Sequence, residues 1–135
     1  MSRRRILVVG GGFAGLAALR YLRHAGAAVE RLLIEPGAAA VFRPLLPDVV
    51  GRNLPPAALA TPYAPLAVRW GFTQRRARAV RVEQAAGRIL CDDGAELQFD
   101  VLIIAPGAQV SFFGRDALRP RAIALDSLEG ATLLA

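Results

Sequence analysis

The short apolar run that ends in glycines, Ile6–Gly15, constrains this chain more than any other stretch. Gly10, Gly12 and Gly15 fit the pattern G-x-G-x-x-G, between residues typical of a buried strand and residues typical of a helix. Gly10 would allow a tight turn, Gly12 would let a pyrophosphate approach the backbone, and Gly15 would let the helix pack close to the strand. The helix start offers N–H groups and a positive dipole end to phosphates. The pattern therefore predicts a dinucleotide-binding loop; a flexible glycine loop without a ligand is the alternative.

An acidic residue follows the second predicted strand, Val29–Ile34. Glu35 lies 25 positions after Gly10, close to the interval of about 20 residues at which a dinucleotide-binding unit places its acid. We expect the Glu35 carboxylate to accept hydrogen bonds from the ribose hydroxyls of an adenosine. The same charge would disfavour a 2′-phosphate by repulsion. A solvated loop acid is the alternative for this residue.

The remaining patterns predict an α/β fold with a parallel sheet and an antiparallel three-stranded meander. Period-two alternation after Ala77 and the Asp93-Gly94 turn signal predict the meander. The other predicted elements are buried parallel strands over Arg5–Val9 and Val101–Ala105, a short strand over Gly71–Gln74, a helix over Phe13–Ala25, a loop over Pro36–Arg52, short helical turns over Leu54–Leu66, and a last helix from Leu128 capped by Asp126 or Ser127.

Composition limits the classes of function that fit. The 135 residues are enough for one domain with a core, and the apolar runs are too short to span a bilayer. The net charge of +6 comes from arginines without lysine, scattered and without an aromatic platform, so a solvated basic face is favoured over nucleic-acid binding. We see no secretory signal and expect a cytoplasmic protein. The lone Cys91 excludes an internal disulfide, and the lone His24 has no histidine partner for a metal site.

The centre of the predicted loop is unusually apolar for an exposed segment. The stretch Phe42–Pro47 includes Leu45 and Leu46. Loops normally carry polar residues to the surface, so this one either packs on the core or forms the wall of a ligand site. Composition favours packing.

Several motifs follow one another along the chain in the same order as in a known family. They are the Gly10–Gly15 loop, Glu35, Phe42–Pro47, Asp93-Gly94 and Phe99–Gly107. With them the sequence resembles the N-terminal part of the FAD-dependent pyridine nucleotide oxidoreductases, most closely the type II NADH dehydrogenases. The resemblance implies one FAD-binding domain over residues 1–135, a Rossmann-like βαβ unit with parallel sheet plus meander, incomplete relative to the family.

The resemblance also implies roles for individual residues. The loop Gly10, Gly12, Phe13, Ala14 and Gly15 would hold the FAD pyrophosphate, and Glu35 the adenosine ribose. The Val80 backbone would meet the adenine; Arg43, Pro44 and Leu45 would lie near the ribityl chain or flavin; Ala105, Pro106 and Gly107 would close over the cofactor. Pro106 departs from the family, which has Thr or a similar small residue there, and it removes a backbone donor.

The resemblance leaves three interpretations open. In the first, the chain is the FAD-binding segment of an enzyme that passes hydride from NAD(P)H to flavin and then to a quinone, peripheral at the inner face of a membrane when complete. The second glycine motif, the returning FAD segment and the membrane-docking region of the family are not found, so we expect a natural truncation, a split-gene piece or an artificially shortened chain that is inactive alone.

In the second interpretation, the chain is a non-catalytic dinucleotide-binding module that needs a partner chain or forms a homodimer. In the third, it is a fragment like a sulfide:quinone oxidoreductase, although Cys91 alone does not supply that reaction's cysteines. None of these interpretations assigns a catalytic residue or a metal.

Overall fold

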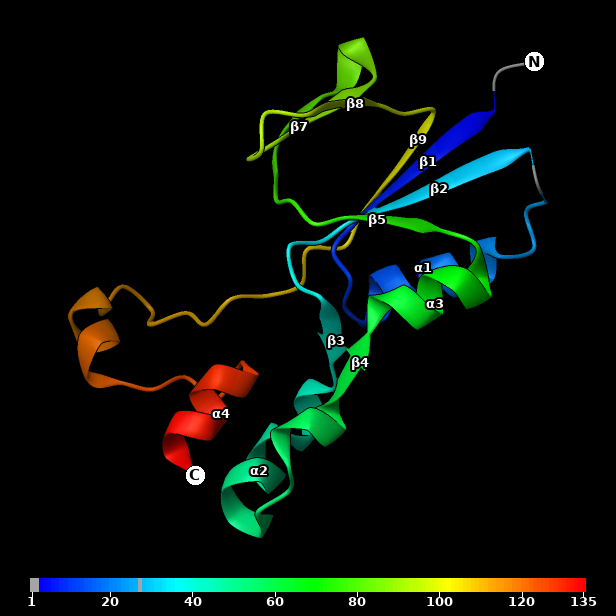
Figure 1. The fold of residues 1–135 in the computed structure, drawn as a ribbon. Helices are drawn as coiled ribbons and strands as arrows, with labels where there is room; N and C mark the ends of the chain where they lie inside the picture. Colours follow the sequence, from blue (N-terminus) through cyan, green and yellow to red (C-terminus); the bar gives the residue numbers. More distant parts are fainter. Residues whose placement is uncertain (1–2, 27) are drawn as a thin grey trace. The chain divides into compact units, whose positions relative to one another are not determined.

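A computed structural model describes residues 3–26 and 28–135 (Figure 1). The chain forms two compact units, which are described separately. The first comprises the described residues up to Ala39 together with Pro62–Gly107, and the second comprises Ala40–Thr61 with Ala108–Ala135. The two short strands β3 (Ala39–Val41) and β4 (Ala60–Pro62) pair with each other where the chain passes from one unit to the other.

A parallel four-stranded sheet forms the centre of the first unit. Its order is β5-β2-β1-β9, and β1 pairs in parallel with both neighbours. The bounds are β1 (Arg4–Val9), β2 (Val29–Ile34), β5 (Thr73–Arg75) and β9 (Val101–Ile104). The predicted parallel strands are confirmed, with β5 at Thr73–Arg75 instead of the predicted Gly71–Gln74 and with β9 ending at Ile104. The strand β1, which has a neighbour on each side, is the one whose apolar residues are buried most completely. The order brings the carboxyl ends of β1, β2 and β9 to the same sheet edge, where ligands bind in such folds.

Two helices, α1 (Phe13–Leu22) and α3 (Tyr63–Trp70), lie on one face of this sheet (Figure 1). Helix α1 ends at Leu22 rather than at the predicted Ala25. The tail tightens into turns in which the N–H of Ala25 donates to the Leu22 carbonyl at 2.9 Å, and Gly26 then takes a positive φ of 75°. The prediction of only short turns over Leu54–Leu66 is wrong at its end, because α3 begins at Tyr63.

The opposite face carries the antiparallel sheet, ordered β6-β7-β8, so the predicted meander is confirmed. Its hairpin turns at Gly94, where φ is 82°. The carboxylate of Asp93 accepts from the Ala95 N–H at 3.1 Å, and this bond lowers the pKa of Asp93. The bounds are β6 (Ala79–Glu83), β7 (Arg88–Cys91) and β8 (Glu96–Gln98).

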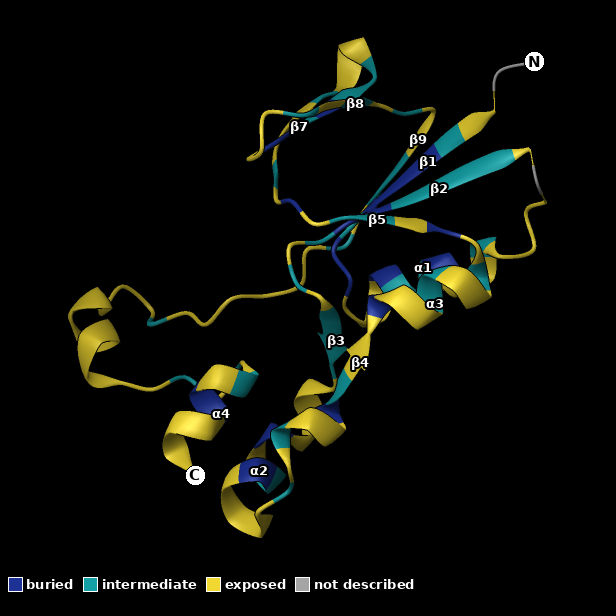
Figure 2. Cartoon of the chain, in the orientation of Figure 1, coloured by how far each residue is buried: buried dark blue, intermediate teal, exposed yellow. Residues whose placement is uncertain are grey.

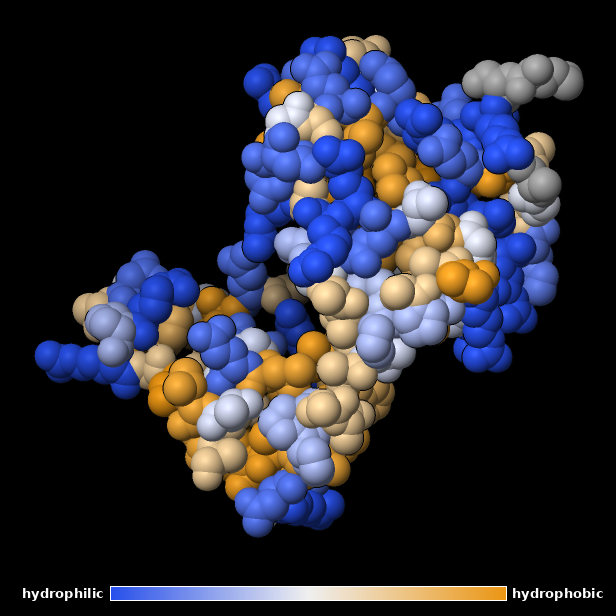
Figure 3. Space-filling model, viewed as in Figure 1, coloured by the Kyte–Doolittle hydropathy of each residue, from blue (hydrophilic) through white to orange (hydrophobic). Residues whose placement is uncertain are grey.

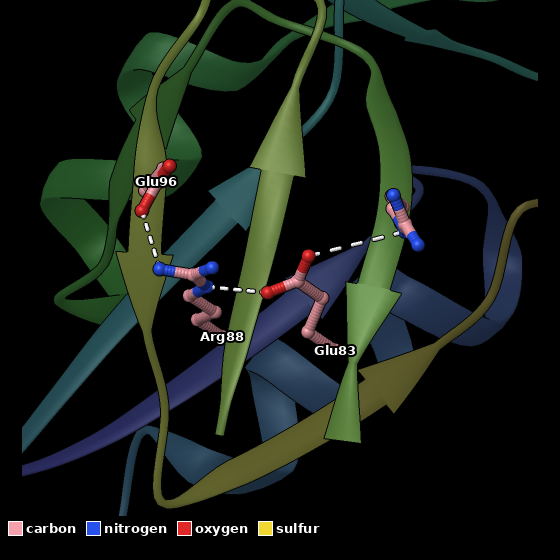
Figure 4. Close-up of polar contacts among 4 residues, drawn as sticks. Glu83, Arg88 and Glu96 are labelled. Carbon is pink, nitrogen blue, oxygen red and sulfur yellow. Dashed lines mark hydrogen bonds and ion pairs between the residues drawn. The ribbon is translucent and has the colours of Figure 1, made fainter. Parts of the chain in front are cut away.

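Charged side chains tie the three meander strands together (Figure 4). Arg88 of β7 donates to Glu83 of β6 at 2.6 Å and to Glu96 of β8 at 2.8 Å. Glu83 also lies 3.9 Å from Arg81. A network of this kind fixes strand register, although partly exposed pairs contribute little individually.

The core of the first unit lies between the two sheets. Leu7, Ile34, Ile89 and Cys91 are buried there. Alternation along β1 turns Val8 the other way, toward α1, and Figure 2 shows buried residues along β1 and on α1. Both faces of the parallel sheet are therefore covered. This packing holds the carboxyl ends of β1 and β2 in place, and the candidate site lies at these ends.

The second unit contains short helices around a smaller core of Leu46, Val49, Leu59 and Ala131. The predicted loop over Pro36–Arg52 is wrong, because β3, a 3₁₀ turn and a helix form there. The element bounds are η1 (Arg43–Leu45), α2 (Leu46–Arg52), η2 (Pro56–Leu59), η4 (Asp116–Arg121) and α4 (Leu128–Leu134). Apolar side chains remain on the surface of this unit over α2 and α4 (Figure 3).

The predicted cap of the last helix is confirmed at Ser127 rather than Asp126. The Ser127 hydroxyl accepts from the Gly130 N–H at 3.1 Å. This bond satisfies one of the free donors at the start of α4.

Candidate functional site

The turn between β1 and α1 has the conformation that its glycines predict. Gly10 has a φ of 95°, which only glycine adopts without strain. A Cβ atom at Gly10 would collide with the Ala105 carbonyl at the end of β9, and its third neighbour would be the Cα atom of Pro106 at 3.1 Å. The segment after β9 therefore lies directly against the glycine turn, and the expected contact of Ala105 and Pro106 with the cofactor stays a prediction.

Gly15 lies where α1 passes closest to β1. A Cβ atom there would collide with the Gly10 carbonyl oxygen and would lie 3.5 Å from Cγ1 of Val8. The predicted reason for glycine at this position, close packing of helix on strand, is what the structure has.

Gly12 differs from both of these glycines. Its φ is −74°, and a Cβ atom there would meet no heavy atom within 4 Å. Neither backbone conformation nor protein packing requires glycine at this position. The open space beside Gly12 leaves room for a ligand group to approach the backbone, and the contact with a pyrophosphate stays a prediction.

The start of α1 also fits an anionic group. Gly12 caps the helix without a side-chain hydrogen bond, and the first turn contains no acidic residue. The positive end of the dipole of this ten-residue helix is therefore not neutralised by a carboxylate of its own first turn.

Glu35 is held beside the turn by backbone groups. Its Oε2 atom accepts from the Gly11 N–H at 2.9 Å, and its Oε1 atom accepts from the Gly37 N–H at 3.0 Å. Gln74 of β5 donates to the carbonyls of Glu35 and Gly37 at 3.0 and 2.7 Å. The carboxylate thus stands fixed at the end of β2, and each oxygen retains a lone pair for a further donor.

Tyr63, which belongs to none of the sequence motifs, lies against the glycine turn in the structure. Its hydroxyl donates to the Gly11 carbonyl at 2.8 Å, and the side chain is 2% exposed. Burial, and secondarily the charge of Glu35, raise its pKa to about 12. No local pattern links positions 11 and 63, because a tertiary contact 52 residues apart has no periodic signal.

The raised pKa of Tyr63 predicts a late alkaline titration. In a Tyr21→Phe variant Tyr63 is the only tyrosine, and phenolate absorbance should rise with a midpoint near pH 12 rather than 10. The folded state holds this proton more tightly than the unfolded state, so the stability that it contributes is present below pH 10 and is lost between pH 10 and 12. A midpoint near 10 in the folded protein would show that the hydroxyl is not buried against Gly11.

The other predicted site residues lie elsewhere. Val80 lies on β6 and is 58% exposed, and Gly107 has a φ of 78° in the irregular segment after β9. Arg43, Pro44 and Leu45 belong to η1 of the second unit, so their roles stay predictions.

Cys91 is a core residue. Its side chain is 5% exposed, and burial raises the pKa of the thiol. Among residues 3–26 and 28–135, no group of three or more His, Cys, Asp or Glu side chains is placed to hold a metal. Across the same residues, no helix has the length and apolarity needed to cross a membrane.

Comparison with known proteins settles the relationship of this chain. The sequence profile of the pyridine nucleotide-disulphide oxidoreductases matches residues 4–134. The chain belongs to this family. The proteins of the family are FAD-binding flavoproteins, so the predicted cofactor class is confirmed for the family.

Two relatives illustrate the likeness in sequence. A type II NADH:quinone oxidoreductase, NdhA of Mycobacterium tuberculosis, is 31% identical over 96% of this chain and 28% of its own length. An external alternative NAD(P)H-ubiquinone oxidoreductase, the mitochondrial B4 protein of Arabidopsis thaliana, is 26% identical over 97% of this chain and 24% of its own length. The chain spans about a quarter to a third of the length of the curated relatives that it matches.

Solved structures confirm the fold. The sulfide:quinone oxidoreductase of Aquifex aeolicus superposes with a TM-score of 0.88 at 22% identity, covering 97% of this chain and 30% of that one. NDH2 of Plasmodium falciparum, in complex with NADH, superposes with a TM-score of 0.87 at 21% identity, covering 98% and 28%. The parallel sheet with its antiparallel meander is the architecture that the sequence resemblance implies.

Proposed function

We propose that this chain is an FAD-binding segment of a flavoprotein oxidoreductase that passes hydride from NAD(P)H to flavin and then to a quinone-type acceptor. The match to NAD(P)H:quinone oxidoreductases along nearly the whole chain supports the kind of reaction. The observation that carries the proposal is the glycine turn, in which Gly10 and Gly15 are required by packing and Gly12 opens on space beside a helix start.

The residues of the glycine turn would bind the pyrophosphate of the cofactor. Backbone N–H groups at Gly12, Phe13 and Ala14 lie at the positive end of α1, where pyrophosphate is favoured. The carboxylate of Glu35 would accept from the ribose hydroxyls while Gly11 and Gly37 keep it in place.

The remaining assignments follow the family. Val80 would lie by the adenine, and Ala105–Gly107 would close over the cofactor. Arg43, Pro44 and Leu45 would lie near the ribityl chain or flavin, with Arg43 meeting negative charge. FAD, when bound, supplies the hydride and electron transfer. We assign no catalytic acid or base to this chain.

In a complete enzyme, this FAD-binding segment would act together with an NADH-binding part. A complete enzyme would lie in the cytoplasm, peripheral at the inner face of the membrane where its quinone is dissolved. The alternative of a non-catalytic module that needs a partner chain is supported by β9 at the sheet edge, where Ile104 is 61% exposed. Open strand edges favour pairing with further chain. The sulfide:quinone oxidoreductase alternative rests on fold likeness alone.

A ligand series tests the proposal. We expect FAD to bind the purified chain, ADP to compete with it, and FMN, which lacks the adenosine, to compete poorly. A 2′-phosphorylated ADP should compete at least about tenfold less well than ADP, because Glu35 repels the added phosphate. Calorimetric titration of FAD into the chain in the presence of each competitor gives these affinities. FMN competing as well as ADP would contradict the assignment of the turn to the pyrophosphate and of Glu35 to the ribose.

A further inference from the structure

Gly11, the second residue of the glycine motif, has less room for a side chain than the motif requires. In G-x-G-x-x-G the second residue is free to vary. At Gly11, however, a Cβ atom would lie 2.5 Å from Cζ and 2.8 Å from Cε1 of Tyr63, and closer still to the hydroxyl. The tyrosine ring therefore occupies the space that a side chain at position 11 would need.

Both backbone groups of Gly11 are engaged by side chains. The N–H donates to Glu35 at 2.9 Å, and the carbonyl accepts from the Tyr63 hydroxyl at 2.8 Å. Glu35 comes from the end of β2, and Tyr63 opens α3, so the residue is fixed by two elements outside its own turn. Gly10 before it is also tied, because its N–H donates to the Ile34 carbonyl at 3.0 Å.

Tyr63 is itself held in place. It is almost fully buried, and its N–H donates to the Ala38 carbonyl at 3.0 Å. A buried phenol with a raised pKa remains a hydrogen-bond donor at all physiological pH values. The bond to Gly11 is therefore not switched by ordinary changes of pH.

We propose that Tyr63 is a positioning residue of the dinucleotide site: with Glu35 it clamps Gly11 from both sides and sets the turn in its binding conformation before the ligand arrives. The proposal deepens the proposed function and rests on it for the identity of the ligand. A turn that is already ordered loses less freedom on binding, so the clamp contributes to affinity without touching the ligand.

The first test uses Tyr63→Phe, which keeps the ring and removes the donor, with Tyr21→Phe as the matched control at an 83% exposed tyrosine of the same unit. We expect Tyr63→Phe to weaken FAD binding about five- to tenfold, as for loss of one hydrogen bond. Without ligand, amide hydrogen exchange at Gly11, followed by NMR, should accelerate at least about tenfold while amides of β1 keep their protection. Tyr21→Phe should change neither quantity.

The second test is a double-mutant cycle. Gly11→Ala should weaken FAD binding at least about tenfold in the wild-type background, because the new methyl meets the Tyr63 ring. In a Tyr63→Leu background the same change should cost less than about threefold. If the effects of Gly11→Ala and Tyr63→Leu on FAD affinity were additive, the proposed clamping of Gly11 by Tyr63 would be contradicted.

The outcomes separate this proposal from the one on which it rests. If the wild-type chain does not bind FAD, the proposed function fails, and the positioning role fails with it. If FAD binds but Tyr63→Phe leaves its affinity unchanged, or accelerates exchange equally throughout the first unit, Tyr63 is only a packing residue and the clamp alone is overturned.

Discussion

Gly15→Ala is expected to lower the free energy of unfolding of the first unit by about 3–5 kcal/mol. Alanine normally stabilises a helix relative to glycine. At this position its methyl group would overlap the Gly10 carbonyl oxygen, so α1 must move away from β1 and the glycine turn must open. Urea denaturation followed by far-ultraviolet circular dichroism, and by the fluorescence of Trp70 in α3, measures the loss.

Gly51→Ala is the matched control, because Gly51 also lies inside a helix but a Cβ atom there meets nothing within 4 Å. This change should leave stability unaltered or raise it by up to about 1 kcal/mol. Equal stability of the Gly15→Ala and wild-type chains would contradict the close packing of α1 on β1.

Gly12→Val is expected to have the opposite profile: the fold remains and FAD binding is lost. The φ of −74° suits a side chain, and the space beside Gly12 is open, so stability should change by less than about 1 kcal/mol. The valine methyl groups would occupy the space that the pyrophosphate needs, and FAD affinity should fall at least about 100-fold. Calorimetric titration with FAD, alongside a thermal melt of the same sample, measures both quantities.

The smaller Gly12→Ala change should produce an intermediate loss of affinity, because one methyl group fills less of the same space. Wild-type affinity in a folded Gly12→Val chain would mean that FAD does not approach the backbone here. Substitution of Gly15 is thus expected to lower stability, whereas substitution of Gly12 is expected to lower FAD affinity.

Strong local patterns allowed much of the fold to be predicted. The apolar runs Ile6–Val9 and Leu32–Ile34 indicate buried strands, and Asp93-Gly94 is a strong signal for a hairpin turn. Helix α2 lacks a strong local signal because it contains Pro47 and Gly51, which are poor helix formers. Pro47 lies in the first turn, where a helix tolerates proline, and burial of Leu46 and Val49 against α4 supplies the stabilisation that local propensity lacks.

Site residues could be predicted from the sequence where the local backbone conformation or a close contact requires one particular residue type. Gly10 and Gly15 belong to this class, since a positive φ and a close helix contact each demand glycine. Tyr63 does not, because its role depends on a hydroxyl reaching a carbonyl 52 residues away. Likewise, nothing local in the sequence indicates that Gln74 holds the backbone beyond β2.

The visible absorption spectrum of the purified 135-residue chain, recorded after incubation with FAD and removal of free cofactor, shows whether the glycine turn holds FAD. A chain whose glycine turn holds the dinucleotide should retain FAD in equimolar amount and show flavin bands, whereas the Gly12→Val chain treated in the same way should be colourless. A folded wild-type chain that emerges without flavin, and shows no affinity for FAD on titration, would contradict the claim.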